Sequence, residues 1–263
     1  MSKLIIFTDL DGTLLNHHTY DYAAVCPILA RLKAANIPVI LNSSKTLAEL
    51  EAWQSKLSLP LPLIAENGGV LQVLNNTGTG VNKILIGQPY AEIRSYIKHL
   101  RKHYHWQFEG FGDWTVSEVM GHTGLHSNDA VLAMEREVTE PILWQDSPEN
   151  LELFKQALAA EHLVLKQGGR FYHVMGNHDK ADAMHFLVNK EYFSCGQHCQ
   201  TIALGDSEND LSMLNYADFA VVLPNASGRV LEVSNAIYAS DPAPMGWVNA
   251  VESLLFSANA KAG

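Results

Sequence analysis

Ten residues near the N-terminus, Leu4-Ile-Ile-Phe-Thr-Asp-Leu-Asp-Gly-Thr13, join a short apolar run to two aspartates. The run at 4–8 is too short for a helix and rich in apolar and β-branched side chains, which predicts a buried strand. Asp9 and Asp11 follow directly, and Gly12 permits a sharp turn. In an open parallel sheet, active sites form beyond the carboxyl ends of the strands. The stretch therefore predicts a site with two carboxylates, or else a turn whose aspartates cap the backbone.

The same alternation of strand and helix continues on both sides of a middle segment. Apolar runs predict strands at 38–42, 61–65, 201–205, 218–223 and 236–239. Helices are predicted between and after them, at 22–35, 46–57, 208–215, 226–233 and 247–256. Buried strands separated by helices are typical of an α/β fold. We expect a doubly wound, Rossmann-like parallel sheet with helices on both faces.

The middle segment, residues 83–176, is richer in charged, His and aromatic residues than its flanks. It predicts helices at 92–104, 128–138 and 148–161 among short strands at 83–86, 106–108, 141–143, 162–166 and 170–174. This mixture predicts an inserted α+β cap domain at 83–176, in a catalytic core formed by 1–82 and 177–263. The turn-rich residues 75–80 suit a hairpin or a hinge.

Charge and composition limit the classes of function. The 263 residues include 18 Lys+Arg and 28 Asp+Glu, for a formal net charge of −10, with no basic cluster. This balance argues against nucleic acid or an anionic membrane as a partner. No apolar run approaches the roughly 20 residues of a membrane helix. Three cysteines, an odd and small number, predict free thiols, and without a secretory signal we expect a cytoplasmic location.

A second pair of carboxylates follows the predicted strand at 201–205. Asp206 comes directly after it, and Asp210 lies about one helical turn further along. Two acidic strand ends in one sheet allow Asp206 to complete a Mg²⁺ site with Asp9, because hard oxygen ligands suit Mg²⁺. Asp210 is expected to hold a metal-bound water or Lys180. The alternative is that Asp206 or Ser207 only caps the next helix.

Two further polar residues are candidates for anion binding. Ser43 follows the predicted strand at 38–42, where its hydroxyl can donate to an anion or cap the helix that begins near Thr46. Lys180 opens a helix after the inserted segment, where it can neutralise carboxylates and phosphate oxygens. A single lysine at a helix start is usually solvated, so Lys180 is a candidate only because the other site residues accompany it.

These motifs resemble those of the haloacid dehalogenase superfamily of phosphatases. The four ordered motifs are Asp9-x-Asp11-Gly-Thr, Ser43, Lys180 and Gly205-Asp206-x-x-Asn209-Asp210. Glu66-Asn67-Gly68 and the position of the insert resemble the Cof-type subgroup of this superfamily. Within that subgroup, five short motifs resemble those of the mannosyl-3-phosphoglycerate phosphatases. They are Asn42-Ser-Ser-Lys-Thr46, Thr123-Gly-Leu125, Arg136-Glu137, Glu140-Pro141 and Gly168-Gly-Arg170-Phe. Lys180-Ala181 departs from the frequent Lys-Gly of the third motif.

The resemblance implies a small phosphomonoester substrate and Mg²⁺ as cofactor. Asp9 would be the nucleophile that forms an aspartyl-phosphate, and Asp11 the general acid and then the general base. Ser43 and Lys180 would hold the phosphoryl oxygens. The implied metal site consists of Asp9, Asp11 through its backbone carbonyl, Asp206 and Asp210.

The cap is expected to select the substrate. A glycosylated phosphoglycerate carries a free carboxylate, which a guanidinium binds well. Arg170 is the first candidate, because Gly168-Gly169 leaves backbone N–H groups open to an anion. The other expected substrate contacts are Ser44, Lys45, Asn67, Arg136 and Glu140. For Arg136, a surface charge on a helix is the alternative.

We therefore expect hydrolysis of mannosyl-3-phosphoglycerate to mannosylglycerate and phosphate. The alternatives are a broader sugar-phosphate or glucosyl-3-phosphoglycerate phosphatase, a sugar phosphomutase, and a non-enzymatic binding protein on the same scaffold. The last would be expected to lack a catalytic residue, and all of them are present in this chain.

Overall fold

The computed structural model describes residues 3–256 except 76, 169, 190–191 and 193–198. The chain forms two compact units. The first comprises Met1–Ser43, Trp53–Pro62 and Lys180–Gly263, and the second comprises Ser44–Ala52 and Leu63–Asp179. The two units are defined by which residues pack together, and not by function. The predicted division into a catalytic core and a substrate-selecting cap, at 82/83 and 176/177, stays a prediction.

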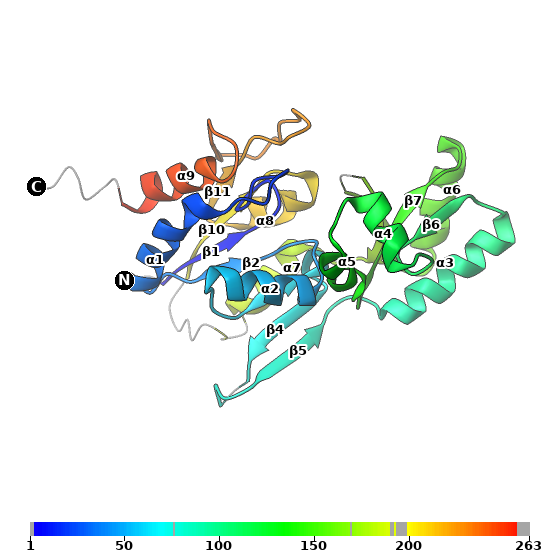
Figure 1. Cartoon of the computed structure of the whole chain (residues 1–263), viewed down its shortest axis with the longest axis horizontal. Helices are drawn as coiled ribbons and strands as arrows, with labels where there is room; N and C mark the ends of the chain where they lie inside the picture. The colour runs from blue at the N-terminus through cyan, green and yellow to red at the C-terminus, as the bar shows by residue number, and fades with distance from the viewer. Residues whose placement is uncertain (1–2, 76, 169, 190–191, 193–198, 257–263) are drawn as a thin grey trace, which may run out of the picture. The chain divides into compact units, whose positions relative to one another are not determined.

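A parallel sheet of five strands forms the centre of the first unit. Its order is β12-β11-β10-β1-β2. The strands are β1 (Leu4–Thr8), β2 (Val39–Leu41), β10 (Gln200–Gly205), β11 (Phe219–Val222) and β12 (Ile237–Tyr238). From β1 the chain moves outward to β2, and from β10 it moves outward in the opposite direction, with β10, β1 and β2 side by side in Figure 1. Open α/β sheets bind ligands where the strand order reverses in this way.

Helices cover both faces of this sheet. The helix α1 (Cys26–Ala34) connects β1 to β2, and α8 (Leu211–Tyr216) connects β10 to β11. Because such crossovers are right-handed and these two run in opposite directions, they lie on opposite faces. The helix α9 (Met245–Leu255) packs against the 3₁₀ turn that precedes α1, and α7 (Lys180–Asn189) packs against α8. The predicted doubly wound α/β fold is confirmed.

The second unit contains two antiparallel sheets. One consists of β3 (Leu63–Ala65), β4 (Val70–Leu74) and β5 (Val81–Leu85), and the β4–β5 connection confirms the hairpin predicted at 75–80. The other has the order β6-β7-β9-β8, with β6 (Phe108–Gly110), β7 (Thr139–Trp144), β8 (Leu163–Gln167) and β9 (Tyr172–Gly176).

Among the described residues, the α-helices that lie entirely in the second unit are α3 (Tyr90–Tyr104), α4 (Val116–Thr123), α5 (Ser127–Met134) and α6 (Pro148–Ala159). Ile93 of α3 and Phe154 of α6 share one buried apolar cluster with Val174 of the larger sheet. The helices α4 and α5 meet in another, around Val119 and Ala130. The helix α2 (Leu47–Leu57) begins in this unit and ends in the first. The predicted mixture of strands and helices is confirmed.

Two local predictions are wrong, and one helix was missed. Residues 226–233 form no helix, because the Asn225 side chain accepts hydrogen bonds from Ser227 N and Oγ, and Gly228 has a φ of 75°. The strand predicted at 61–65 exists as β3, but it pairs antiparallel with β4 instead of joining the parallel sheet. The helix α4 was not predicted, although Thr115 and Glu118 have the spacing of a capping box and form both of its bonds.

The thiol prediction is half right. Among the described residues, Cys26 is a free and exposed thiol, whereas Cys199 is disulfide-bonded. The expectation of free thiols is therefore wrong for Cys199, and Cys195 lies outside the described residues.

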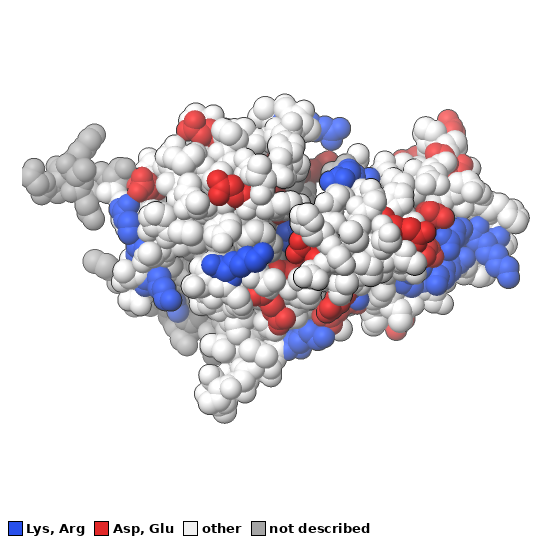
Figure 2. All heavy atoms as spheres, in the orientation of Figure 1, with Lys and Arg blue, Asp and Glu red and all other residues white. Residues whose placement is uncertain are grey.

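Surface charge is distributed unevenly on the face drawn in Figure 2, where Lys and Arg side chains gather over α3. The sequence of α3 contains Arg94, Lys98, Arg101 and Lys102. In the part of the chain that the structure describes, none of the helices has the length and apolar character needed to span a membrane.

Candidate active site

Three buried aspartates come together at the carboxyl end of the parallel sheet. Asp9 follows β1 and Asp206 follows β10, and the Asp9 N–H donates to the Leu204 carbonyl at 3.0 Å, which holds the two strand ends level. The carboxylates of Asp9, Asp206 and Asp210 each offer one oxygen, and these oxygens lie within 4.8 Å of one another. The strand pairing thus brings together carboxylates that are almost 200 residues apart in the sequence.

Lys180 joins two of these carboxylates. Its Nζ donates to Asp9 Oδ1 at 2.7 Å and to Asp210 Oδ1 at 2.6 Å, and its side chain is fully buried. The Asn42 side chain, which follows β2, donates to the Lys180 carbonyl at 3.0 Å and fixes the start of α7. Burial alone would lower the pKa of Lys180, but Asp210 and Asp9 raise it well above its usual range. The lysine is therefore charged and is not on the solvated surface.

One lysine does not balance the negative charge of the site. Burial raises the pKa of Asp9 to about 7, against the attraction of Lys180 and with added repulsion from Asp210 and Asp11. Burial, with the charges of Asp210 and Asp9, raises the pKa of Asp206 to about 8. A divalent cation would relieve this repulsion. Three buried carboxylates with converging oxygens are a donor set that fits a hard cation.

Both carboxylate oxygens of the buried Asp210 accept hydrogen bonds from within the protein. While its Oδ1 accepts Lys180, its Oδ2 accepts the backbone N–H groups of Asp206 and Ser207, each at 3.0 Å. Of the two roles expected for Asp210, the structure shows the one of holding Lys180. The same bonds fix the turn on which Asp206 is presented.

Two residues that support Asp206 were not singled out from the sequence. Asn225 donates through Nδ2 to Asp206 Oδ2 at 2.8 Å and to the Asp206 carbonyl at 3.0 Å. Thr13 donates through Oγ1 to Asp206 Oδ1 at 3.1 Å. Asn225 lies just beyond β11, at the sheet edge where polar side chains were sought after the other strands. Its position was therefore a usable signal.

Gly12 leaves room for Asp206. It has a φ of +80°, and a Cβ built on it would lie 2.9 Å from Asp206 Oδ2. Both the backbone conformation and the space at this position favour glycine.

Asp11 and Ser43 lie beside this centre along the chain. Asp11 is half-buried on the turn after β1, where Gly12 N–H donates to the Leu15 carbonyl at 3.0 Å. The Asn42 N–H donates to the Thr8 carbonyl at 2.9 Å, so the register places Asn42 next to Asp9 and the buried Ser43 one residue further on. Their predicted roles in proton transfer and anion binding stay predictions.

The predicted substrate-binding residues, from the predicted cap and from the predicted core alike, lie in the second unit. The Arg136 side chain is only 6% exposed and its Nη1 donates to the Ser44 carbonyl at 3.0 Å, so the alternative of a surface charge is wrong. Asn67 is buried with a φ of 57°. Arg170 is exposed and donates to the His122 carbonyl at 3.1 Å. Gly169 lies outside the described residues, and the anion nest proposed there stays a prediction.

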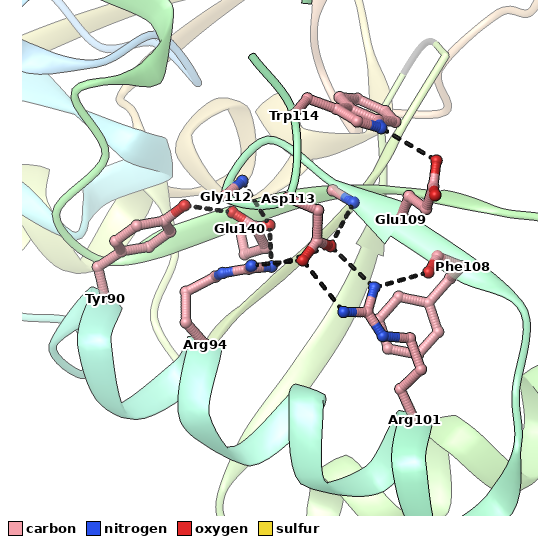
Figure 3. Close-up of polar contacts among 10 residues, drawn as sticks. Tyr90, Arg94, Arg101, Phe108, Glu109, Gly112, Asp113, Trp114 and Glu140 are labelled. Carbon is pink, nitrogen blue, oxygen red and sulfur yellow. Dashed lines mark hydrogen bonds and ion pairs between the residues drawn. The ribbon is translucent and has the colours of Figure 1, made fainter. Parts of the chain in front are cut away.

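Glu140, another predicted contact, is at the centre of a polar network drawn in Figure 3. It is fully buried, its Oε1 accepts Arg94 at 2.6 Å and Gly112 N–H at 3.0 Å, and its Oε2 accepts Tyr90 at 2.6 Å. Arg94 also binds Asp113, at 2.7 Å. Both Glu140 oxygens are thus engaged within the unit, which the sequence prediction of a contact with sugar hydroxyls did not foresee.

Comparison with known proteins agrees with this geometry. A model of the haloacid dehalogenase-like hydrolase family matches residues 6–246. A relative from Persephonella marina, named glucosyl-3-phosphoglycerate/mannosyl-3-phosphoglycerate phosphatase, is 34% identical over 96% of this chain and 97% of its own length.

Solved structures share the fold at low sequence identity. A haloalkanoate-superfamily phosphatase from Bacteroides thetaiotaomicron matches with a TM-score of 0.70 at 18% identity, over 95% of this chain and 94% of that one. A protein from Thermoplasma acidophilum matches with a TM-score of 0.69 at 16% identity, over 97% and 100% of the two chains. With the family model spanning both acidic strand ends and Lys180, the chain belongs to the haloacid dehalogenase-like hydrolases.

Proposed function

We propose that this protein is a Mg²⁺-dependent phosphatase that hydrolyses the phosphomonoester of a glycosyl-3-phosphoglycerate through an aspartyl-phosphate on Asp9. The observation that carries the proposal is the buried Lys180 between Asp9 and Asp210, beside Asp206. This arrangement sets a carboxylate nucleophile, a fixed cation and a metal-ligand set at one sheet edge. Phosphoryl transfer depends mainly on such positioning and charge stabilisation.

Asp9 is suited to attack phosphorus. Its carboxylate stands at the end of a buried strand, and the ion pair with Lys180 favours the charged form that a nucleophile needs. As the Oδ–P bond forms, the bond from phosphorus to the C3 oxygen of the glycerate part breaks. The resulting acyl phosphate has a carboxylate as its leaving group, which makes the second step, attack by water, easy.

Asp11 is suited to move the proton. It lies two residues beyond Asp9 on the turn, and it would protonate the departing alkoxide and then take a proton from the attacking water. Ser43 would donate to a phosphoryl oxygen from the end of β2. Mg²⁺ held by Asp9, Asp206 and the Asp11 carbonyl would supply positive charge to the transferring phosphoryl group.

The substrate class rests on the similarity to the Persephonella marina relative, whose name includes both glucosyl- and mannosyl-3-phosphoglycerate. Both compounds carry a phosphate for the core site and a glycerate carboxylate. They differ in the orientation of one hydroxyl group. We favour the mannosyl compound, as the sequence motifs do, and keep the glucosyl compound as the alternative.

The test is phosphate release over a substrate panel, in Mg²⁺ and then in EDTA. The panel contains mannosyl- and glucosyl-3-phosphoglycerate, 3-phosphoglycerate, mannose 6-phosphate and sucrose 6-phosphate. A kcat/KM at least about 100-fold higher for a glycosyl-phosphoglycerate, lost in EDTA, is the expected result. Similar weak rates on every ester would retain the phosphatase and contradict the substrate. Phosphate transfer between sugar positions without release would indicate a mutase instead.

A further inference from the structure

A chain of two buried hydrogen bonds runs from α9 to the proposed nucleophile. The Trp247 side chain donates through Nε1 to Thr8 Oγ1 at 3.1 Å, and Thr8 Oγ1 donates to the Asp9 carbonyl at 2.8 Å. Trp247 and Thr8 are fully buried, and Asp9 is 5% exposed. All three residues belong to the first unit. Neither Trp247 nor Thr8 takes part in the steps proposed for the reaction.

The direction of each bond is set by the groups that form it. An indole N–H can only donate, so the Thr8 hydroxyl has to accept the bond from Trp247. The hydroxyl carries one proton, and that proton is directed to the Asp9 carbonyl. Trp247 therefore orients the hydroxyl, and the hydroxyl orients the peptide group that follows Asp9.

These two polar groups stand where apolar side chains would serve the fold as well. Thr8 ends a strand whose other residues are apolar, and Val has nearly the shape of Thr and suits a strand equally. At position 247, Phe would keep an aromatic ring without the N–H. Burying a hydroxyl or an N–H costs free energy unless the group is hydrogen-bonded. Two such groups, bonded to each other and directed at Asp9, indicate a role beyond packing.

The chain completes the fixation of Asp9. The Asp9 N–H donates to the Leu204 carbonyl at 3.0 Å, and the Asp9 carbonyl accepts the Thr8 hydroxyl. These bonds hold the backbone on both sides of the Asp9 Cα and so set the direction in which its side chain leaves the chain. The bond from Lys180 Nζ to Oδ1, at 2.7 Å, then sets the rotation of the carboxylate. Without the Thr8 hydroxyl, the peptide group between Asp9 and Leu10 loses this bond.

Trp247 is itself held in place by the start of α9. The Gly246 N–H donates to the Pro242 carbonyl at 2.9 Å, and a Cβ on Gly246 would overlap the Asp241 carbonyl. The Asn249 side chain donates to Asp241 Oδ2 at 3.0 Å. These contacts fix the first turn of α9 against the segment after β12, and from this turn Trp247 reaches the end of β1.

We propose that Trp247 and Thr8 are positioning residues, which hold Asp9 in the orientation for attack on phosphorus through the bond from the Thr8 hydroxyl to the Asp9 carbonyl. The inference rests on the proposed function and deepens it, because it extends the machinery of the first step to a helix far along the chain. Neither residue touches the substrate. They act on the rate of phosphoryl transfer to Asp9, and not on substrate binding.

The experiment measures single turnovers, with the enzyme in excess over the ester that the wild-type protein hydrolyses best. The maximal rate then reports phosphoryl transfer to Asp9, and the half-saturating concentration reports binding. For Thr8→Val we expect the maximal rate to fall about tenfold, with the half-saturating concentration within about twofold of the wild type. Thr8→Ser, which keeps the hydroxyl, should stay within about threefold of the wild-type rate.

Trp247→Phe tests whether the indole acts through Thr8. The variant removes the N–H, and the hydroxyl keeps its bond to Asp9 without the donor that orients it, so we expect a smaller loss of about threefold. The double variant Thr8→Val/Trp247→Phe should be no slower than Thr8→Val alone. The reason is that two changes along one chain of hydrogen bonds are not additive.

Thr201→Val is the matched control for stability. Thr201 is buried on β10, which pairs with β1, and lies near the opposite end of the sheet from Thr8. Its hydroxyl donates to Asp218 Oδ2 at 2.9 Å. The thermal midpoint should therefore fall in Thr201→Val as in Thr8→Val, whereas the single-turnover rate of Thr201→Val should equal that of the wild type. Rates are compared at a temperature at which every variant is folded.

Four results would overturn the inference. An unchanged rate in Thr8→Val would leave the hydrogen bond without a role in the reaction, and equal losses in Thr201→Val would make Thr8 a residue of the fold alone. A Thr8→Ser variant as slow as Thr8→Val would show that the hydroxyl is not the acting group. Losses that multiply in the double variant would separate Trp247 from Thr8. A wild-type protein that releases phosphate from none of the esters is a distinct outcome, which overturns the proposed function and this inference with it.

Discussion

Lys180 Nζ lies 2.7 Å from Asp9 Oδ1, and both groups are buried at the end of β1. The lysine comes from a segment 171 residues further along the chain and also binds Asp210, at 2.6 Å. It therefore ties the first strand of the sheet to the turn after β10 through charge. The same ammonium is close enough to Asp9 to meet a phosphoryl oxygen on that carboxylate.

Removal of Lys180 should harm both stability and activity. Lys180→Met leaves Asp9 and Asp210 buried without their cation, so we expect a loss of about 3–5 kcal/mol in the free energy of unfolding. Turnover should fall by about 10²-fold or more, because a fixed positive charge is lost from the transition state. Urea unfolding and phosphate release measure the two effects. A variant with wild-type stability would contradict the buried ion pair.

Mg²⁺ binding should strengthen as pH rises from 6 to 9. Without a cation, the pKa values of Asp9 and Asp206 are about 7 and about 8, so at pH 6 both groups largely hold protons that the metal must displace. Folding raises both pKa values above the ordinary 3.8, so the metal-free protein should lose stability as pH rises from about 4 to 8. Mg²⁺ should offset that loss.

Thermal unfolding with and without Mg²⁺ checks this pH dependence. The increase in Tm caused by Mg²⁺ should be larger at pH 8.5 than at pH 6, and Asp206→Asn should abolish most of it. An equal increase at both pH values in the wild-type protein would mean that the metal does not bind at these carboxylates.

Ala variants of Gly12 and Gly78 distinguish the cost of backbone strain from an effect on the metal site. Both have positive φ, +80° and +69°, but a Cβ at Gly12 would meet Asp206, whereas one at Gly78 meets nothing within 4 Å. Each Ala variant should cost about 1–2 kcal/mol through its φ. Only Gly12→Ala should also weaken Mg²⁺ binding, measured by calorimetry. Equal Mg²⁺ affinity in the two variants would contradict the contact with Asp206.

Arg94 and Arg101 form a matched pair in the second unit, since both bind Asp113. Arg94 also binds the fully buried Glu140, so Arg94→Met should cost about 3–5 kcal/mol in chemical denaturation. Arg101 is 29% exposed, and Arg101→Met should cost about 1 kcal/mol or less. Similar losses in the two variants would show that Glu140 does not depend on Arg94.

Sequence alone predicted the parallel strands of the first unit well, because short apolar runs such as 4–8 and 201–205 are typical of buried strands. It could not tell that the strand at 63–65 pairs with β4, since hydrogen-bond partners are not encoded in periodicity. The helix predicted at 226–233 failed where the side chain of Asn225 competes for backbone N–H groups. Local apolar spacing does not reveal that competition.

The site was predictable where chemistry and position agreed. Carboxylates after strands pointed to Asp9 and Asp206, and their meeting follows from the parallel pairing of β1 with β10. The burial of Glu140 was not predictable, because it depends on which charged groups the second unit encloses. A sequence shows the charge of such residues but not their partners.

The most direct test of the account is phosphate release by Asp9→Asn. Asn keeps the size and hydrogen bonding of Asp9 but cannot form the acyl phosphate, and its loss of one negative charge should leave the protein folded. With saturating Mg²⁺ and the substrate that the wild-type protein hydrolyses best, the variant should be slower by about 10⁴-fold or more. A folded variant that retains a rate within tenfold of the wild type would contradict Asp9 as the nucleophile.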